Sequence, residues 1–411
     1  MTMTSGAREL DAASLRRTHP PETLGFGSTA EVQPLEDPSR RQRELTEPIE
    51  NEHIAPAVRG CRVVAAELCE KRRPPGLSIA LAKPGAIWSG GLGLADIEAA
   101  TAADADTVYL WFSMTKLVTA TAVMQLVERG KLDLDSPVRH LVPEFPKNGA
   151  RVTTRHLLSH SAGLANPIPI GWIRPADAPA EPLDLFTARL LKKHQRLRAR
   201  PGGRASYSNL GYLVLGEVIQ AASGIPYCDY VREQVLEPLG MTSTDFAYRK
   251  DMAPRAATGY HPRFDISAPL LRVMTPTGTF DHHVGRFWAL SRFCVEGAPY
   301  GGLIGSVADA ARFLDLHVDP AAHPRVLSKE AVAAMQQTTA HGRRLDVGLG
   351  WFRRHRDPEN GSRYWEHLGG GGGFFNVMRI YPERRLGLVA MGNATSWDHL
   401  KLLRAATQGG V

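Results

Sequence analysis

Long apolar runs are missing from this chain of 411 residues. No uninterrupted stretch approaches the ~20 apolar residues that a membrane-spanning helix needs. The N-terminus has no apolar stretch after its charged residues, so no secretory signal is expected. Cysteine is scarce as well, since four scattered residues with no C-x-x-C pair cannot form a disulfide framework. These absences predict a cytoplasmic protein in a reducing compartment, with no membrane partner.

A strong charge of one sign is also lacking, because 49 basic and 42 acidic residues leave a net charge of +7. Two basic patches, Arg40–Arg43 and Leu191–Arg200, are joined to no helix-turn-helix, RNA-binding sheet or run of stacking aromatic residues. We interpret them as solvated surface and expect no nucleic-acid partner. With 43% apolar and 22% charged residues, the composition is that of a globular protein with two or three lobes.

Hydrophobic periodicity divides the chain into three parts. Residues 1–52 show no period and are expected to form a flexible extension. A helical pattern over 53–72 precedes two short apolar runs, 77–82 and 86–95, whose Lys-Pro-Gly link predicts a β-hairpin. Helical patterns follow over 154–161, 210–222, 227–235, 307–317 and 329–337, and strand-like runs return over 348–352, 376–381 and 385–391.

Strands at both ends of the chain with helices between them predict an α+β fold. One sheet would take its strands from both ends, with a helical lobe inserted in the middle. The boundaries that we expect are 53–110 and 301–411 for the lobe that contains the sheet, and 111–300 for the all-helical lobe.

The first candidate for chemistry is Ser113-Met-Thr-Lys116, at the start of an amphipathic helix expected over 113–129 and ended by Gly130. Positions i and i+3 share one helix face, so the Lys116 amine can reach the Ser113 hydroxyl. A serine becomes a nucleophile when a neighbouring base activates it, and the positive helix end favours developing negative charge. Ser-x-x-Lys alone is a weak signal, since a chain of this length holds about one by chance.

The second candidate is the stretch PGGRASYSN, which carries Tyr207 and Asn209 just before a predicted helix. It has two interpretations: a turn with Asn209 as the helix N-cap, or a loop that presents a phenol and a carboxamide to a substrate. In the second, Tyr207 would relay protons and Asn209 would orient the acyl group or the lysine.

The third candidate is a run of five glycines, 369–373, after Glu366-His367-Leu368. Backbone N–H groups without side chains allow a substrate to approach closely, or an oxyanion to be bound. A flexible turn between strands is the other interpretation. A phosphate-binding loop is disfavoured because no Gly-Lys-Ser/Thr follows.

Together these stretches resemble the motifs of the serine β-lactamase and penicillin-binding-protein superfamily, in its class C β-lactamase-like branch, which includes the family VIII carboxylesterases. The motifs Ser-x-x-Lys, Tyr-x-Asn and Lys/His-x-Gly are similar to Ser113–Lys116, Tyr207–Asn209 and His367–Gly369. The resemblance extends to the flanking stretches LVERGKLDLDSPV, VTTRHLLSHSAGL, EPLGMTSTDF and GGLIGSVADAARF. It covers roughly residues 53–395.

The resemblance implies a fold and a mechanism. An antiparallel sheet flanked by helices would lie beside an all-helical lobe, with the active site in the cleft between them. Ser113 would form an acyl-enzyme, and the N–H groups of Ser113 and Gly370 would bind the oxyanion. Either Lys116 or Tyr207 could be the base, and we expect the two to form one proton network with Ser113.

One departure bears on the substrate. Penicillin-recognising members carry lysine in the third motif, whereas this chain has His367, which is mostly neutral near pH 7. The sequence therefore predicts hydrolysis of small, neutral carboxylic esters. A β-lactamase, a D-amino-acid peptidase, a transacylase and a non-catalytic scaffold remain alternatives, and the sequence does not decide the oligomeric state.

No metal and no cofactor are expected. His156 and His160 stand four residues apart on a predicted helix, as two metal ligands could, but no glutamate accompanies them in a His-Glu-x-x-His pattern.

Overall fold

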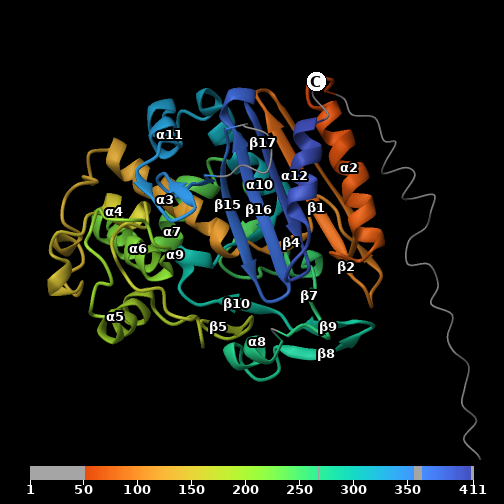
Figure 1. Ribbon diagram of the computed structural model, residues 1–411, viewed down its shortest axis with the longest axis horizontal. Coiled ribbons are helices and arrows are strands. Elements are labelled where there is room, and N and C mark those ends of the chain that lie inside the picture. The colour runs from red at the N-terminus through yellow and green to blue at the C-terminus, as the bar shows by residue number, and fades with distance from the viewer. Residues whose placement is uncertain (1–50, 267, 356–362, 409–411) are drawn as a thin grey trace, which may run out of the picture. The chain divides into compact units, whose positions relative to one another are not determined.

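The computed structural model describes residues 51–266, 268–355 and 363–408 (Figure 1). The flexible extension expected over 1–52 therefore lies outside the described residues, except for its last two, as does the basic patch Arg40–Arg43. Within the described part, no helix has both the length and the apolar character that crossing a bilayer requires.

A nine-stranded antiparallel sheet organises the described part of the chain, in the order β12-β13-β14-β15-β16-β17-β1-β2-β3 (Figure 1). Its strands are β1 (Gly76–Lys83), β2 (Ala86–Asp96), β3 (Thr101–Ala102), β12 (Ala340–His341), β13 (Leu345–Val347), β14 (Phe352–Arg354), β15 (Trp365–Gly371), β16 (Phe374–Tyr381) and β17 (Leu386–Gly392). Strand β1 pairs with β17, so that Leu77 lies opposite Gly392. This pairing confirms the prediction that strands from both ends of the chain form one sheet.

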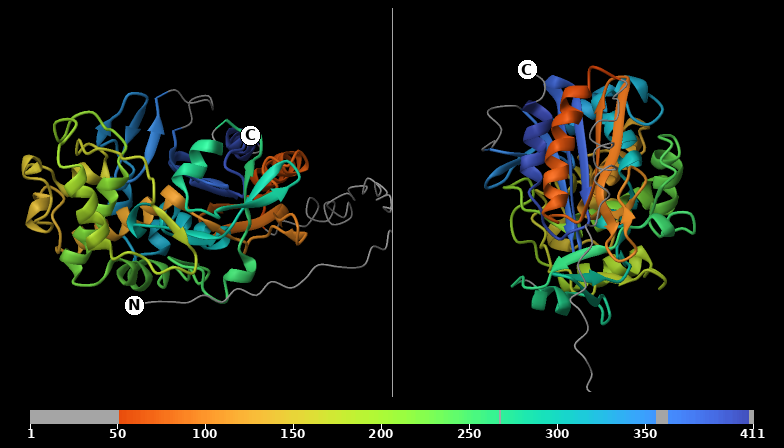
Figure 2. Two further views of the ribbon diagram at one scale, coloured as in Figure 1. Left: turned by 90° about the horizontal axis from the view of Figure 1, so that it is seen from below. Right: turned by 90° about the vertical axis from the view of Figure 1, so that its right-hand side faces the viewer.

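Helices cover both faces of this sheet, which explains why β1 is apolar at successive positions. Leu77 and Ile79 pack in a cluster with residues of α2 (Ala55–Glu70) and α12 (His399–Gln408). Ala80, on the opposite face, belongs to the cluster that contains α10 (Val307–Val318) (Figures 1 and 2). Side chains alternate between the faces of a strand, so a strand covered on both faces needs no alternation of apolar and polar residues. The polar Ser78 of β1 is buried, and its hydroxyl donates to the Asp104 carbonyl oxygen at 2.6 Å.

The middle of the chain is mostly helical. Its helices are α3 (Thr115–Glu128), α4 (Thr154–Leu158), α5 (Leu183–Lys193), α6 (Asn209–Ser223), α7 (Tyr227–Val231), α8 (Ala268–Met274) and α9 (Ala298–Gly301), and α11 (Lys329–Met335) follows α10. One-turn 3₁₀ or π segments are η1 (Phe112–Met114), η2 (Val138–His140), η3 (Lys147–Gly149), η4 (Arg232–Leu236), η5 (Ala253–Arg255), η6 (Pro320–Ala322) and η7 (Pro382–Arg384).

The insertion expected to be all-helical also contains strands. These are β5 (Ile173–Pro175), β6 (Thr244–Asp245), β7 (Gly259–Pro262), β8 (Phe280–Val284), β9 (Phe287–Leu290) and β10 (Phe293–Val295). They form small sheets, one of which joins β6 to β4 (Val108–Leu110) through β11 (Ile304–Ser306). Strands of two to five residues are too short to show a reliable alternation in the sequence, which is why periodicity did not indicate them.

Helix α3 differs from its expected form. The sequence predicts an amphipathic helix, but every residue of α3 from Thr115 to Leu126 is buried. A helix enclosed on all sides belongs to the interior of a protein. Its predicted end is confirmed, because Gly130 adopts a φ of +66° there.

Candidate active site

Ser113 lies in η1, the 3₁₀ turn that leads directly into α3. The preceding residue, Phe112, has a φ of +48°, a left-handed conformation that costs a non-glycine residue about 1–2 kcal/mol. Backbone strain of this kind persists where the surrounding structure holds it, and it gathers at functional sites. The Phe112 ring, 6.2 Å from that of Phe293, is part of this support.

Two side chains hydrogen-bond to the Ser113 hydroxyl. Lys116 Nζ lies 3.0 Å from Ser113 Oγ, and the Tyr207 hydroxyl donates to the same oxygen at 2.7 Å. Lys116 Nζ also donates to the Tyr300 carbonyl oxygen at 2.7 Å. The contact between Lys116 and Ser113 predicted from their spacing is confirmed, and the Tyr207 loop joins it from 94 residues away.

Burial sets the electrostatics of this trio. The Lys116 side chain is fully buried, and this burial lowers its pKa well below the ordinary value of 10.5. The rings of Tyr207, Tyr212 and Tyr300 surround its amine at 4.9, 5.4 and 5.2 Å. Burial raises the pKa of Tyr207, although the hydrogen bond to Ser113 opposes that shift. The lysine is thus the group more readily deprotonated, and the phenol the group that keeps its proton.

A histidine that the sequence did not single out for this site forms its wall. The ring of His160 lies 4.6 Å from that of Tyr207 and stacks at 5.3 Å on Phe352. Its Nδ1 accepts a hydrogen bond from the Ser208 backbone N–H at 3.1 Å, which fixes the loop beside Tyr207. Burial, with Lys116 and His367 nearby, lowers the pKa of His160 well below 6.5, so the ring is neutral.

The two histidines considered as metal ligands have separate roles. His156 completes a capping box at the start of α4, where its Nδ1 accepts from the Thr153 backbone N–H at 3.1 Å. His160 belongs instead to the wall described above. The sequence signal that could have placed His160 at this site is its position in the flanking stretch VTTRHLLSHSAGL.

The helix that follows the Tyr-x-Asn motif, α6, begins at a different N-cap residue from the one considered in the sequence. Ser208, not Asn209, is the N-cap of α6, because its hydroxyl accepts a hydrogen bond from the Gly211 N–H at 3.2 Å. The backbone N–H of Asn209 donates to Asn166 Oδ1 at 3.0 Å. Asn209 Oδ1 is buried and has no hydrogen-bond partner within the described residues, Lys116 included. This oxygen is therefore an unsatisfied acceptor beside the Tyr207 loop.

The glycine run is mainly strand, and only its end is a turn. Gly369 to Gly371 close β15, and the chain reverses at Gly372 and Gly373 before β16. A Cβ on Gly369 would lie 2.1 Å from the Trp111 carbonyl oxygen, and one on Gly371 would lie 2.2 Å from the Phe112 ring. These two glycines let β15 approach the turn that carries Ser113, whereas Gly370 is exposed.

His367, two residues before Gly369 in the third motif, is buried and neutral. Its Nδ1 lies 2.8 Å from the Leu368 carbonyl oxygen, while its Nε2 has no partner within the described residues. Burial, assisted by the charge of Lys116, lowers the pKa of His367 to about 3. The position therefore offers no cation to a substrate carboxylate near neutral pH.

Within the described residues, the side chains of one cluster, His341, Asp346 and His355, are of the types that bind metal ions. Ligand atoms of His341, Asp346 and His355 lie within 4.8 Å of one another, and both imidazoles hydrogen-bond to Asp346 Oδ1, at 2.7 and 2.9 Å. Arg353 already pairs with Asp346 Oδ2 at 2.7 Å. Burial would raise the pKa of Asp346, but these three hydrogen bonds lower it to about 2. Hydrogen bonds from the two imidazoles and the ion pair with Arg353 thus surround Asp346 in this structure.

Comparisons with known proteins place this geometry in a family. The Beta-lactamase family model matches residues 61–409. Penicillin-binding protein 4 of Amycolatopsis lactamdurans is 28% identical over 323 residues, which cover 75% of this chain and 78% of that protein.

Solved structures of other proteins share this fold. The octameric penicillin-binding protein homologue from Pyrococcus abyssi has a TM-score of 0.68 and 26% identity, over 86% of this chain and 77% of that one. EstCE1, a hydrolase with promiscuous acyltransferase activity, shares the fold with a TM-score of 0.70 and 21% identity, over 88% of this chain and 100% of that one. Because the family model spans most of the chain and includes all three motifs, the chain belongs to the Beta-lactamase family.

Proposed function

We propose that the protein is a serine hydrolase that cleaves small carboxylic esters through an acyl-enzyme on Ser113, as a family VIII carboxylesterase-like member of its family. The observation that carries this proposal is the pair of hydrogen bonds that converge on Ser113 Oγ from Lys116 and Tyr207. A hydroxyl bonded at once to a buried amine and to a phenol can give its one proton to the amine, while the phenol supplies the proton that the leaving group needs.

Lys116 is the better base of the two. As its neutral amine takes the Ser113 proton, Ser113 Oγ forms a bond to the acyl carbon, and the carbonyl oxygen becomes an oxyanion. The backbone N–H groups of Ser113 and Gly370 would stabilise that oxyanion. Tyr207 then gives its proton to the departing alkoxide, and Lys116 returns one to Tyr207. In the second half-reaction, water attacks the acyl carbon and gives its proton to the same network, and Ser113 leaves reprotonated.

The neutral third motif favours esters over anionic lactams. His367 is buried with its pKa lowered to about 3, so no cation stands where penicillin-recognising relatives have lysine. Asn209 Oδ1, which lacks a partner within the described residues, would orient the substrate. A β-lactamase, a D-amino-acid peptidase or a transacylase on the same site remains the second candidate, favoured by the similarity to penicillin-binding protein 4.

We also propose that the enzyme works in the cytoplasm. Its four cysteines, Cys61, Cys69, Cys228 and Cys294, are all free thiols, and three of them are buried. Free cysteines persist in a reducing compartment.

Turnover of a chromogenic butyrate ester tests the proposal. We expect Ser113→Ala to lose at least about a thousandfold in kcat/KM, while the surface control Ser396→Ala keeps wild-type activity. A chromogenic cephalosporin or a D-amino-acid amide turned over faster than the ester would favour the second candidate. Equal ester turnover by wild type and Ser113→Ala would refute both.

A further inference from the structure

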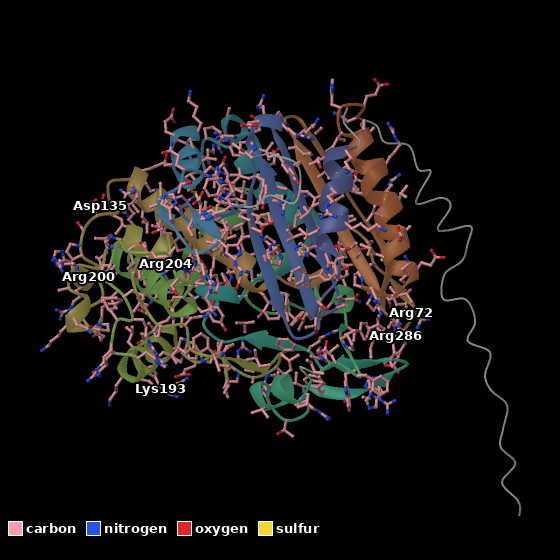
Figure 3. All side chains as sticks on the ribbon, viewed as in Figure 1. Arg72, Asp135, Lys193, Arg200, Arg204 and Arg286 are labelled. Atoms are coloured by element: carbon pink, nitrogen blue, oxygen red, sulfur yellow. The ribbon has the colours of Figure 1, made fainter. Side chains whose placement is uncertain are left out.

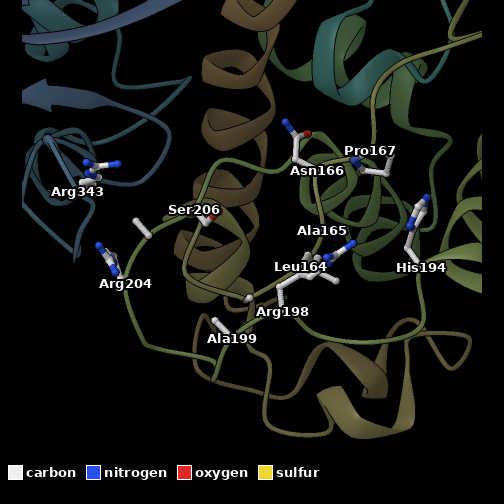
Figure 4. A pocket seen from close by; sticks show the side chains of 12 residues that line it. Leu164, Ala165, Asn166, Pro167, His194, Arg198, Ala199, Arg204, Ser206 and Arg343 are labelled. Carbon is white, nitrogen blue, oxygen red and sulfur yellow. The ribbon is translucent and has the colours of Figure 1, made fainter.

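A cavity with a volume of about 760 Å³ lies beside the Tyr-x-Asn loop (Figure 4). Three segments line it: residues 163–167, residues 194–206 and the turn after β12, which contributes Arg343. The second segment ends at Ser206, and the next residue in the chain is Tyr207, whose hydroxyl donates a hydrogen bond to Ser113. A cavity of this size suits part of a small molecule.

The lining is basic, and no acidic residue belongs to it. Arg198, Arg204, Arg343 and His194 supply the basic groups, and in Figure 4 Arg204 and Arg343 lie on one side with His194 opposite. Within the described residues, none of the three arginines forms a salt bridge. Burial first, and then the charges of Lys193 and Arg198, lower the pKa of the half-buried His194.

Backbone hydrogen bonds hold the cavity in shape. The N–H of Arg198 donates to the Gly163 carbonyl oxygen at 2.7 Å, and that of Ala205 donates to the His341 carbonyl oxygen at 2.9 Å. Gly163 has a φ of +74°, and a Cβ there would lie 2.2 Å from the Ala199 carbonyl oxygen. The three backbone segments are thus joined before any ligand binds, so only the exposed side chains of Arg198, Arg204 and Arg343 would have to be ordered on binding.

A second basic cavity offers a contrast. Around Arg72 and Arg286, on the far side of the molecule in Figure 3, the lining includes Glu67 and Asp398. Glu67 pairs with both Lys71 and Lys401. That cavity supplies its own counter-charges, whereas the one beside Tyr207 leaves its guanidinium groups for an external anion.

We propose that the cavity lined by Arg198, Arg204 and Arg343 binds an anionic group, a carboxylate or a phosphate, that the substrate carries away from its reacting ester. The inference rests on the proposed ester hydrolysis at Ser113 and names the class of ester. Guanidinium groups bind such anions through paired, charge-assisted hydrogen bonds. The Asn166 amide and the Ser206 hydroxyl, which also line the cavity, can donate to the remaining oxygens.

Matched esters test this assignment. The neutral probe is the p-nitrophenyl butyrate ester. One anionic probe is the p-nitrophenyl hemiglutarate ester, with its carboxylate on the acyl side, and another is a carboxylated phenyl butyrate, with its carboxylate on the leaving group. We expect at least one anionic ester to show a KM about tenfold higher in Arg204→Gln and Arg343→Gln than in wild type, with the neutral ester unchanged. Inorganic phosphate should compete with that anionic ester in wild type.

The control is Arg325→Gln, an exposed arginine outside both cavities, which should change none of the three KM values. Equal effects of Arg204→Gln and Arg343→Gln on neutral and anionic esters, or no effect on any, would overturn the assignment while leaving ester hydrolysis intact. Should no ester be hydrolysed, the proposed function fails instead, and the cavity is then tested by calorimetry with phosphate. Binding by wild type that Arg204→Gln and Arg343→Gln lose would support an anion site, and no binding would refute it.

Discussion

The two sides of Ser113 are built in opposite ways. On one side, the amine of Lys116 and the rings of Tyr207 and His160 fill the space; Lys116 and His160 are buried, and Tyr207 is half-buried. On the other side, the hairpin of β15 and β16 brings the backbone of Gly369 and Gly371 close to the turn at Phe112. Proton transfer needs side chains whose pKa values are shifted by burial, whereas oxyanion binding needs bare N–H groups at close range.

The largest loss of activity should come from a substitution on the side of Ser113 that Lys116 and Tyr207 occupy. Tyr207→Phe keeps a ring against His160 but removes the hydroxyl that donates to Ser113, so we expect kcat/KM for a butyrate ester to fall by about 10²–10⁴. The control is Tyr230→Phe, which removes a hydroxyl bonded to Arg129 at the opposite end of α3. If Tyr207→Phe retained wild-type kcat/KM, Tyr207 would have no part in proton transfer.

Glycine-to-alanine substitutions, which add one methyl group each, test the other side of Ser113, formed by the hairpin of β15 and β16. Gly369→Ala should lower the free energy of unfolding by about 1–3 kcal/mol and reduce ester turnover, because its Cβ meets the rigid Trp111 carbonyl oxygen. Gly372→Ala, in the turn of the same hairpin, is the matched control, since its Cβ meets only Leu290 Cδ2, at 3.3 Å. Urea unfolding and kcat/KM measure both changes. Equal losses in the two variants would mean that close approach is not what requires glycine at position 369.

Lys116 should show that the site is maintained at the expense of stability. Because burial lowers its folded pKa below 10.5, the unfolded chain binds more protons, and stability at this residue falls as pH decreases from 10.5 toward the folded pKa. Lys116→Met should therefore unfold at higher urea than wild type at pH 7, with a difference that narrows toward pH 10.5. A difference that stayed constant across this range would show that the lysine is not held neutral.

The smallest effect concerns His367 on the glycine side. With a pKa lowered to about 3, His367 does not change its protonation between pH 5 and 8. The ratio of kcat/KM between wild type and His367→Gln should thus be the same at every pH in that range. If kcat/KM of wild type showed an inflection near pH 6.5 that His367→Gln removes, the imidazole would be exposed to water rather than buried.

Features that depend on residues close in sequence were predicted correctly from the sequence. The spacing of Ser113 and Lys116 determines their contact, and the link of Pro84 and Gly85 determines the first hairpin, because both depend on residues close in sequence. Gly130 ended its helix for the same reason.

Long-range packing explains what the sequence could not show. The polar residues of α3 suggest a solvent-facing side, yet Thr119 donates to the Pro299 carbonyl oxygen and Gln125 to that of Val326, so the helix is buried all round. His160 reaches the site only because α4 and the Tyr207 loop meet. The requirement for glycine at position 369 depends on Trp111, which lies more than 250 residues earlier in the chain.

Trapping the covalent intermediate is the most direct test of the account. Wild-type protein quenched in acid during turnover of a slow ester is digested, and its peptides are mapped by mass spectrometry. The account predicts one added acyl group, on the peptide that contains Ser113, and its loss in Ser113→Ala. An acyl group on any other residue, or one that persists in Ser113→Ala, would contradict it.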